Sequence, residues 1–253
     1  MYIDTHCHLS KGDYTDIDQV IKESILAGVS PIIVSFCNKE NMKEAKELST
    51  KYKEVYITLG YHPEEAEKIK KEDILSLEEQ LKESKVVGIG EIGLDYHYGK
   101  DQKDKQITLF EEQLQLAEKN HLPVVIHSRD ATEDTLLILE KYRGKVKGII
   151  HCFSGSLEVA KQYIKLGYYL GIGGVVTFKN SNLKKVVEQI SFDNIVLETD
   201  SPYLSPEPYR GKKNSSKNIP VIAEEIAKIK GVTLQKVEEE TTKNAKKIFK
   251  IKE

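Results

Sequence analysis

Short apolar runs alternate with amphipathic stretches along most of this chain. Runs rich in valine and isoleucine, such as residues 31–36 and 86–91, are typical of strands buried on both faces of a sheet. Between such runs, apolar residues recur every three or four positions, as in residues 17–27 and 103–120, and this spacing predicts helices. We expect strands at residues 2–9, 31–36, 55–60, 86–91, 123–127, 148–151, 168–172 and 195–200, and helices at residues 17–27, 39–52, 74–83, 103–120, 132–142, 157–166, 183–190, 219–230 and 233–249.

The order of these elements predicts a (β/α)8 TIM barrel of the α/β class. Strands that alternate with helices pair in parallel through right-handed crossovers, and eight such units close a barrel. No Pro-rich or Gly-rich linker divides the chain, so we expect residues 1–253 to form a single domain. The extra C-terminal helices, at residues 219–230 and 233–249, are expected on the outside of the barrel. An open doubly wound sheet is the alternative, because periodicity does not show whether a sheet closes.

Composition narrows the classes of partner and the compartment. The chain has 38 Lys and Arg against 40 Asp and Glu, a net charge of −2, which excludes a global basic field for holding nucleic acid. The first residues lack the pattern of a signal peptide, and no run approaches the ~18 apolar residues of a membrane span. Three scattered cysteines, Cys7, Cys37 and Cys152, argue against a disulfide framework. We therefore expect a cytoplasmic protein outside any membrane, and no stable protein partner is implied.

Histidines and carboxylates gather where the expected strands end. His6 and His8 share one face of the first strand, while Cys7 between them faces the helices as a packing residue. Glu198 lies on the same side of the last strand as Asp200 but one layer deeper, where it would support a ligand or pack in the core. In a TIM barrel the C-terminal ends of the strands form the active site. Five of the seven histidines and two acidic residues fall at those ends, namely His6, His8, His62, His127, His151, Glu91 and Asp200.

These residue types point to a metal centre. Four imidazoles and two carboxylates exceed the needs of one tetrahedral ion that keeps a position open for water. They suit two divalent ions about 3.5–4 Å apart, bridged by a carboxylate and by a hydroxide that acts as the nucleophile. Glu91 is the expected bridge, and Asp200 would ligate one ion while it orients or deprotonates the water. The alternative is a buried polar network without metal, in which carboxylates and imidazoles would have to pair with one another.

Polar groups in the neighbouring loops could contact a substrate. Arg129, after the fifth strand, and Arg210, after the eighth, could clamp phosphate oxygens. Lys212 and Lys213 follow in the same loop, but a solvated loop explains these two lysines equally well. His97, just beyond the fourth strand, either touches substrate or caps its loop.

Six motifs and a closing helix, in this order along nearly the whole chain, resemble those of the TatD-type metal-dependent hydrolases. Members of that family are described as deoxyribonucleases within the amidohydrolase-like barrels. The ordered set is far more specific than any one motif. The matching segments are Asp4-Thr5-His6-Cys7-His8, Gly60-Tyr61-His62-Pro63, Gly88-Ile89-Gly90-Glu91-Ile92-Gly93-Leu94-Asp95, Ile126-His127-Ser128-Arg129, His151-Cys152-Phe153-Ser154-Gly155, Glu198-Thr199-Asp200-Ser201-Pro202-Tyr203 and Asn244-Ala245-Lys246-Lys247-Ile248-Phe249.

The resemblance implies a cofactor, a reaction and a set of ligands. It implies dependence on Mg²⁺, Mn²⁺ or Zn²⁺ and hydrolysis of phosphodiester bonds in DNA, often from an end. His62 would line the site as a contact for substrate phosphate or for an accessory metal. Where the family usually continues with Glu-Pro after Asn214, this chain has Ser215-Ser216, which leaves the grip of this loop on substrate open. The implied metal ligands are His6, His8, Glu91, His127, His151 and Asp200.

Three functions fit this sequence. The leading one is a deoxyribonuclease acting on single strands or ends, which a barrel mouth admits more readily than the flank of a duplex. Because the net charge is close to zero, we expect weak and strongly salt-dependent binding of DNA. The second is hydrolysis of a carboxylic ester, amide or lactone, such as an aminoacyl ester, since a fold does not fix a function. The third is a non-catalytic metal-dependent protein that binds nucleic acid, which the complete ligand set argues against.

Overall fold

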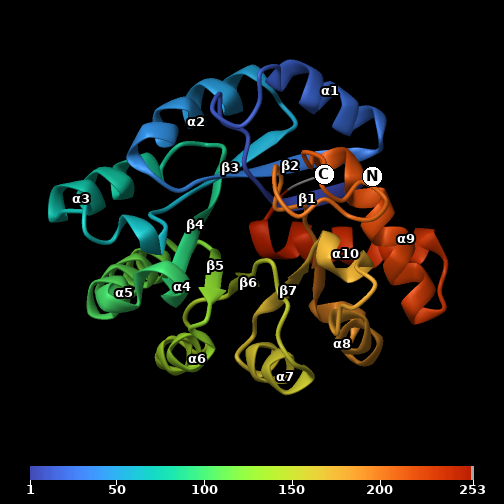
Figure 1. Cartoon of the computed structure of the whole chain (residues 1–253). Helices are drawn as coiled ribbons and strands as arrows, with labels where there is room; N and C mark the ends of the chain where they lie inside the picture. Colours follow the sequence, from blue (N-terminus) through green and yellow to red (C-terminus); the bar gives the residue numbers. More distant parts are fainter. Residues whose placement is uncertain (252–253) are drawn as a thin grey trace.

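Eight parallel strands lie side by side in chain order, with helices around them (Figure 1). The structure is a computed structural model that describes residues 1–251, apart from the side chains of residues 98–100. Residues 252–253 of the expected domain lie outside the described residues. Within the described range, no helix is both long and apolar enough to span a bilayer. The elements are β1 (Tyr2–Cys7), α1 (Ile17–Leu26), β2 (Val29–Phe36), α2 (Lys39–Lys51), β3 (Val55–Leu59), α3 (Lys71–Gln80), β4 (Val86–Asp95), α4 (Tyr96–Gly99), α5 (Lys103–Asn120), β5 (Val124–Arg129), α6 (Thr132–Lys141), β6 (Gly148–Ile150), α7 (Leu157–Lys165), β7 (Tyr169–Ile172), α8 (Leu183–Gln189), β8 (Ile195–Leu197), α9 (Ile219–Lys230) and α10 (Leu234–Phe249).

Hydrogen bonds between β1 and the segment after β8 close the ring of strands. The backbone N–H of Asp200 donates to the carbonyl of His6 at 3.0 Å, and the N–H of His8 donates to the carbonyl of Ser201 at 2.7 Å. A doubly wound sheet would instead place its first strand inside the strand order and leave two free edges. The TIM-barrel prediction is therefore confirmed, and the open sheet is excluded.

The inside of the barrel changes from apolar to polar along its axis. Residues from the early part of six strands form an apolar layer. Further along the strands, the hydroxyls of Ser35 and Thr58 lie 2.7 Å apart, and Ser35 Oγ lies 3.0 Å from His6 Nδ1. The polar end of the interior is thus the end at which the strands terminate. The apolar layer consists of Ile3, Ile33, Val87, Val125, Ile149 and Val196.

Helix α10 covers the apolar end of the barrel. Ala245, Ile248 and Phe249, in its last turns, pack on the apolar layer, and in Figure 1 the helix lies behind the strands. Both C-terminal helices thus lie on the outside of the barrel, as expected, and α10 lies across its apolar end. Periodicity showed an amphipathic helix but not which surface of the barrel lacked a cover. Helix α9 packs against α8 and α10.

The largest differences from the expected strand ends are those of β4 and β8. β4 continues past residue 91 to Asp95, because β5 pairs with it as far as the Asp95–Arg129 position. The Gly90–Glu91 peptide bond within β4 is cis. β8 ends at Leu197, so residues 198–200 belong to the segment that follows it. Pairing with neighbouring strands, rather than the local pattern, sets these limits.

Candidate metal centre

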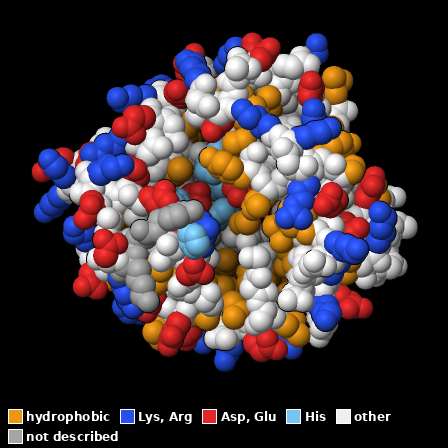
Figure 2. Space-filling model, in the orientation of Figure 1, with side chains coloured by type: hydrophobic (Ala, Val, Ile, Leu, Met, Phe, Trp, Pro, Cys, Tyr) orange, Lys and Arg blue, Asp and Glu red, His pale blue; other side chains and the backbone are white. Residues whose placement is uncertain are grey.

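A hollow at the C-terminal ends of the strands holds the predicted histidines and carboxylates. Figure 2 shows histidine and acidic side chains at its floor. The six residues expected as metal ligands lie together here, although residues 6 and 200 are far apart in the sequence. Their donor atoms form three groups, in each of which the atoms lie within 4.8 Å of one another: His6, His8 and Glu91; His6, His151 and Asp200; and Glu91, His127 and His151.

Glu91 stands between two pairs of imidazoles. Its Oε1 lies 2.7 Å from His127 Nδ1 and 2.7 Å from His151 Nε2. Its Oε2 lies 3.6 Å from Nε2 of both His6 and His8. The side chain is 5% exposed, so these contacts are formed away from bulk water. Each carboxylate oxygen therefore faces its own group of nitrogen donors, which is the arrangement needed of a bridging carboxylate.

Asp200 lies in the same site and belongs to the segment after β8, which is hydrogen-bonded to β1. Its Oδ1 lies 3.4 Å from His6 Nε2 and 3.7 Å from His8 Nε2. Its backbone has a φ of 54°, in the left-handed region that aspartate tolerates better than most residues. Hydrogen bonds on both sides hold this conformation: its N–H donates to His6, and its carbonyl accepts from Tyr203 N–H at 3.0 Å. The segment after β8 thus presents Asp200 to His6 and His8 in a fixed position.

One buried nitrogen shows that the donor set fits divalent metal ions. His6 is fully buried, and its Nε2 has no hydrogen-bond partner among the described residues. Because Nδ1 of this ring contacts Ser35 Oγ, Nε2 is turned toward Glu91 and Asp200. A buried nitrogen without a hydrogen bond is costly unless a ligand takes its lone pair. A metal ion at this position would do so.

The charges of the site also suit cations. Burial alone would raise the pKa of Glu91, but His151 and His127 beside it hold that pKa well below its usual range. Burial would likewise raise the pKa of Asp200, but the neighbouring imidazoles of His6 and His8 lower it. Both carboxylates therefore stay ionised in a water-poor site and require positive charge nearby.

The carboxylates in turn raise the pKa of three imidazoles in the site. Burial lowers the pKa of a histidine, yet hydrogen bonding to Asp200 raises that of His8 well above the usual value, and Glu91 does the same for His151. The pKa of His127 is raised as well, by Asp95 and Glu91 against burial. In the metal-free protein, protons on these rings thus supply the charge that metal ions would bring.

Asp95 belongs to the site although it was not among the residues expected there. Its Oδ2 lies 3.0 Å from His127 Nε2, so it holds that ring with Nδ1 toward Glu91. The backbone of Asp95 is itself held by Gln106, whose side chain accepts from its N–H at 2.9 Å and donates to its carbonyl at 2.8 Å. The alternation of a strand continued past Glu91 would have placed Asp95 on the same face. The expected strand ended too early to show it.

A second carboxylate, Asp4, supports the site from below and was also missed. Asp4 is fully buried, and its oxygens accept hydrogen bonds from Thr199 N–H at 3.0 Å and from the Thr199 hydroxyl at 2.6 Å. It also accepts from His6 N–H at 3.3 Å. Asp4 thus ties the strand that carries His6 to the segment that carries Asp200. It stands two residues before His6, where the alternation of a strand pointed to the same face.

Glu198 lies deeper in the barrel beside His151. Its Oε1 accepts a hydrogen bond from Cys152 N–H and lies 3.7 Å from His151 Nδ1. The neighbouring position in β7 must be glycine, because a Cβ on Gly171 would lie 2.1 Å from Glu198 Oε2. Glu198 is thus positioned to support the segment that carries His151.

His62 presents a hydrogen-bond donor to the hollow. Its Nδ1 accepts from Glu64 N–H at 3.3 Å, and burial lowers its pKa to about 4, so the neutral ring carries its proton on Nε2. That nitrogen lies 3.7 Å from Glu91 Oε1. Donor atoms of His62, Asp95 and His127 also lie within 4.8 Å of one another, but the protonated Nε2 has no lone pair for a metal. This tautomer favours contact with substrate.

The loop residues expected to touch substrate lie in different surroundings. Arg129 ends β5 opposite Asp95, next to the metal centre. Arg210 lies over the ring of Phe178, with its guanidinium carbon 4.4 Å from the ring centroid. Lys213 donates to the carbonyl of Asp13, so it fastens its loop to the loop after β1. His97 Nδ1 lies 3.0 Å from Asp130 at the exposed rim.

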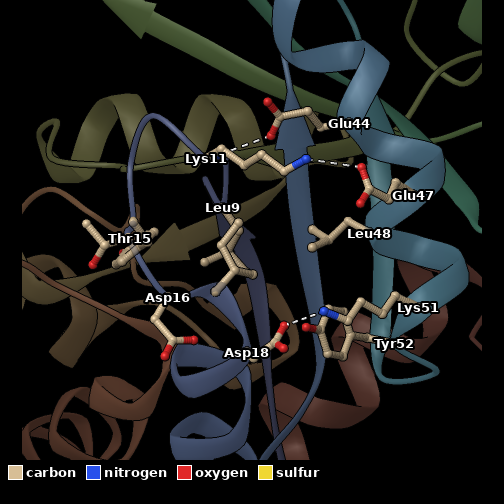
Figure 3. A pocket seen from close by; sticks show the side chains of 12 residues that line it. Leu9, Lys11, Thr15, Asp16, Asp18, Glu44, Glu47, Leu48, Lys51 and Tyr52 are labelled. Atoms are coloured by element: carbon tan, nitrogen blue, oxygen red, sulfur yellow. Dashed lines mark hydrogen bonds and ion pairs between the residues drawn. The ribbon is translucent and has the colours of Figure 1, made fainter.

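A separate pocket of about 410 Å³ lies between the loop after β1 and helices α1 and α2 (Figure 3). Its charged side chains pair across it: Lys11 with Glu47 at 3.2 Å, and Lys51 with Asp18 at 2.6 Å. None of the six expected ligands lines it. The pocket is therefore distinct from the metal centre.

Sequence and structure both match known proteins along nearly the whole chain. The sequence model of a family described as TatD related DNase matches residues 3–250. The uncharacterized metal-dependent hydrolase YabD of Bacillus subtilis is 42% identical over 99% of this chain and 100% of its own. The crystal structure of the Escherichia coli TatD homolog YjjV has a TM-score of 0.92 at 29% identity, covering 99% of this chain and 98% of that one. A TatD family hydrolase from Entamoeba histolytica has a TM-score of 0.86 at 27% identity, covering 98% and 97%.

Proposed function

Because the chain belongs to the family of TatD-related DNases, we propose that this metal-dependent hydrolase is a deoxyribonuclease that cleaves phosphodiester bonds of DNA. The observation that carries the proposal is the position of Glu91. Its two oxygens face two separate groups of imidazoles inside a buried site, as in centres that hold two divalent ions for phosphoryl transfer.

Two divalent ions, Mg²⁺, Mn²⁺ or Zn²⁺, are part of the proposal. His6, His8 and Asp200 would hold one ion, His127 and His151 the other, with Glu91 between them. When bound, such ions supply an activated water and neutralise charge on phosphoryl oxygens. Donors of this kind accept several divalent metals, so availability decides which one is bound.

Asp200 is the proposed general base. One of its oxygens faces His6 and His8, and we assign the other to orienting the attacking water and accepting its proton. The hydrogen bonds that fix its backbone keep this carboxylate in place, so little motion is needed during the reaction. Glu91 contributes by holding the two groups of donors at a constant separation.

Three other side chains are proposed to bind the substrate. His62 would donate its Nε2 proton to a phosphate oxygen. Arg129 and Arg210 would contact further phosphates at the rim. Because the net charge is −2, DNA would be held only by a few contacts near the metal centre. This supports a strand end rather than a long duplex as substrate. We propose stepwise cleavage of single strands from an end, with DNA as a transient partner.

A cytoplasmic location completes the proposal. The three cysteines are free, as expected of a protein in a reducing compartment.

The test is digestion of defined oligonucleotides together with a metal analysis of the same protein. Single strands and duplexes labelled at either end are incubated with enzyme of known metal content, beside carboxylic and aminoacyl esters. We expect the single strand to shorten from one end. Asp200→Asn should lower kcat by about 10²–10⁴-fold while the protein retains its metal. The same change at an exposed position, Asp193→Asn, is the matched control.

The contrary results separate the alternatives. Hydrolysis of esters without cleavage of DNA would make the protein an acyl hydrolase. Metal and DNA binding without turnover of any substrate would make it a binding protein. Equal activity in Asp200→Asn would contradict the assignment of the general base.

A further inference from the structure

Tyr203 is an exposed aromatic residue directly beside the metal centre. Its side chain is 59% exposed, although it follows Asp200 by only three residues. The centroid of its ring lies 6.3 Å from that of His8, with an interplanar angle of 68°. An aromatic ring thus lies at the edge of the hollow, next to an expected metal ligand.

The backbone of Tyr203 is held on both sides. Its N–H donates to the carbonyl of Asp200 at 3.0 Å, and its carbonyl accepts from Asn214 Nδ2 at 2.7 Å. Asn214 is fully buried and also donates to the carbonyl of Thr199 at 2.9 Å. These bonds are made by backbone and Asn214 atoms, so the Tyr203 ring is not needed to hold the segment together. The backbone that carries the ring is thus held in place while the ring itself is open to a ligand.

Other side chains near Tyr203 also expose apolar surface. Leu204 and Tyr209, in the same loop, are 39% and 41% exposed, and Arg210 of this loop lies over the ring of Phe178. Figure 2 shows hydrophobic side chains beside the hollow, with the acidic and histidine side chains at its floor. The rim thus offers flat apolar surface next to a site that suits phosphate.

We propose that Tyr203 stacks on the nucleobase at the end of a single strand and so selects an unpaired terminal nucleotide. This inference rests on the proposed deoxyribonuclease function and names the part of the substrate that the site recognises. Every base has a flat face, so stacking of this kind tolerates any sequence. Bases inside a duplex have both faces covered by neighbours, whereas an unpaired end can turn one face to the ring.

The chemistry of the site favours a base over other apolar groups. A strand end bound with its phosphate at the metal centre necessarily carries a base within a few ångströms of that phosphate. Because Tyr203 follows Asp200 closely and contacts His8, its ring lies within reach of that base. A terminal nucleotide would therefore place its phosphate at the metal centre and its base on the ring.

The test compares two substrates on the same enzyme. One is a single-stranded oligonucleotide, and the other is identical except that both terminal nucleotides lack their bases. We expect the wild-type protein to cleave the first terminal bond of the complete strand with a kcat/KM about 5- to 150-fold higher, as stacking on one aromatic residue allows. Tyr203→Ala should abolish this preference, and Tyr203→Phe should keep it, because the ring remains.

Partial misfolding of a variant lowers kcat/KM for both substrates equally, so it does not change the ratio of the two values measured on one preparation. Leu137→Ala, at an exposed position of α6, removes a similar apolar area and serves as the control. The inference is overturned if wild type cleaves both strands equally, or if Tyr203→Ala retains the full preference. If the protein cleaves neither strand under any metal, the proposed function fails and this inference with it.

Discussion

Asp4 provides a sharp test of how the barrel holds its metal centre, because it joins β1 to the segment with Asp200. Its Oδ1 accepts from Thr199 N–H at 3.0 Å and from His6 N–H at 3.3 Å, and its Oδ2 accepts from the Thr199 hydroxyl at 2.6 Å. Asp4 is fully buried, so water does not replace these bonds. We predict that Asp4→Ala destabilises the metal-free protein and weakens metal binding, whereas Asp4→Asn keeps most of both.

The size of the effect follows from the hydrogen bonds. In Asp4→Ala three buried donors lose their acceptor, and each such group costs about 1–3 kcal/mol. We expect the free energy of unfolding at pH 5.5 to fall by about 3–9 kcal/mol, a large share of the ~5–15 kcal/mol of a typical domain. In Asp4→Asn the carbonyl still accepts from both N–H groups and the amide donates to the hydroxyl. The loss there should be about 1 kcal/mol.

The dependence on pH is an independent check. Burial raises the pKa of Asp4 to about 7, against hydrogen bonds from Thr199, Ser216 and His6. A carboxyl whose pKa is higher in the folded than in the unfolded protein contributes stability that is complete below its ordinary pKa of about 4 and is lost as the pH rises through 7. Asparagine does not titrate, so Asp4→Asn should gain stability relative to wild type between pH 5.5 and 8. Only the 1.5 pH units from 5.5 to the folded pKa of about 7 contribute in this interval, which sets an upper limit of about 2 kcal/mol on the gain.

Urea unfolding in excess chelator, followed by circular dichroism, measures these differences without a contribution from metal. Affinity for Zn²⁺ is measured separately by competition with a chromogenic chelator. Equal urea midpoints for Asp4→Ala and Asp4→Asn at pH 5.5 would refute the hydrogen-bond reasoning. A difference between Asp4→Asn and wild type that is constant from pH 5.5 to 8 would refute the effect of burial on the carboxyl.

Two further predictions concern the cofactor and the substrate. Despite burial, neighbouring carboxylates raise the pKa of His8, His127 and His151, so Zn²⁺ must displace protons at pH 7. Calorimetry in two buffers of different ionisation enthalpy should show proton release and an affinity that falls at lower pH; binding without proton release would contradict this. Single-strand binding by metal-loaded Asp200→Asn should weaken with salt, and adding Arg129→Gln or Arg210→Gln should flatten the slope of log affinity against log salt by about 0.7 each. Unchanged slopes would remove these arginines from the phosphate contacts.

Local patterns were sufficient for the architecture and for most of the candidate site. Apolar runs and helical spacing report which face of each element is buried, and the alternation of strands and helices predicts a parallel barrel. The barrel topology then brings strand ends together, so the sequence alone groups His6, Glu91, His127 and Asp200 at one site. Resemblance to one family added the reaction and the metals.

Other features depend on contacts between residues far apart in the chain. β4 reaches Asp95 only because β5 pairs with it, and α10 lies under the barrel because the apolar layer inside needed a cover. Ser215 and Ser216, where the chain departs from its family, are buried and so belong to the support of the loop.

Which side chains stand at the strand ends follows from short stretches of the chain, since both the periodicity and the residue types are local properties. How those side chains are supported depends on contacts that form only in the folded protein. Asp4 meets Thr199 across 195 residues, and Asn214 fixes Tyr203 while leaving its ring in water. Such contacts are set by closure of the ring and by the packing of loops over it, and no short window of sequence contains both partners.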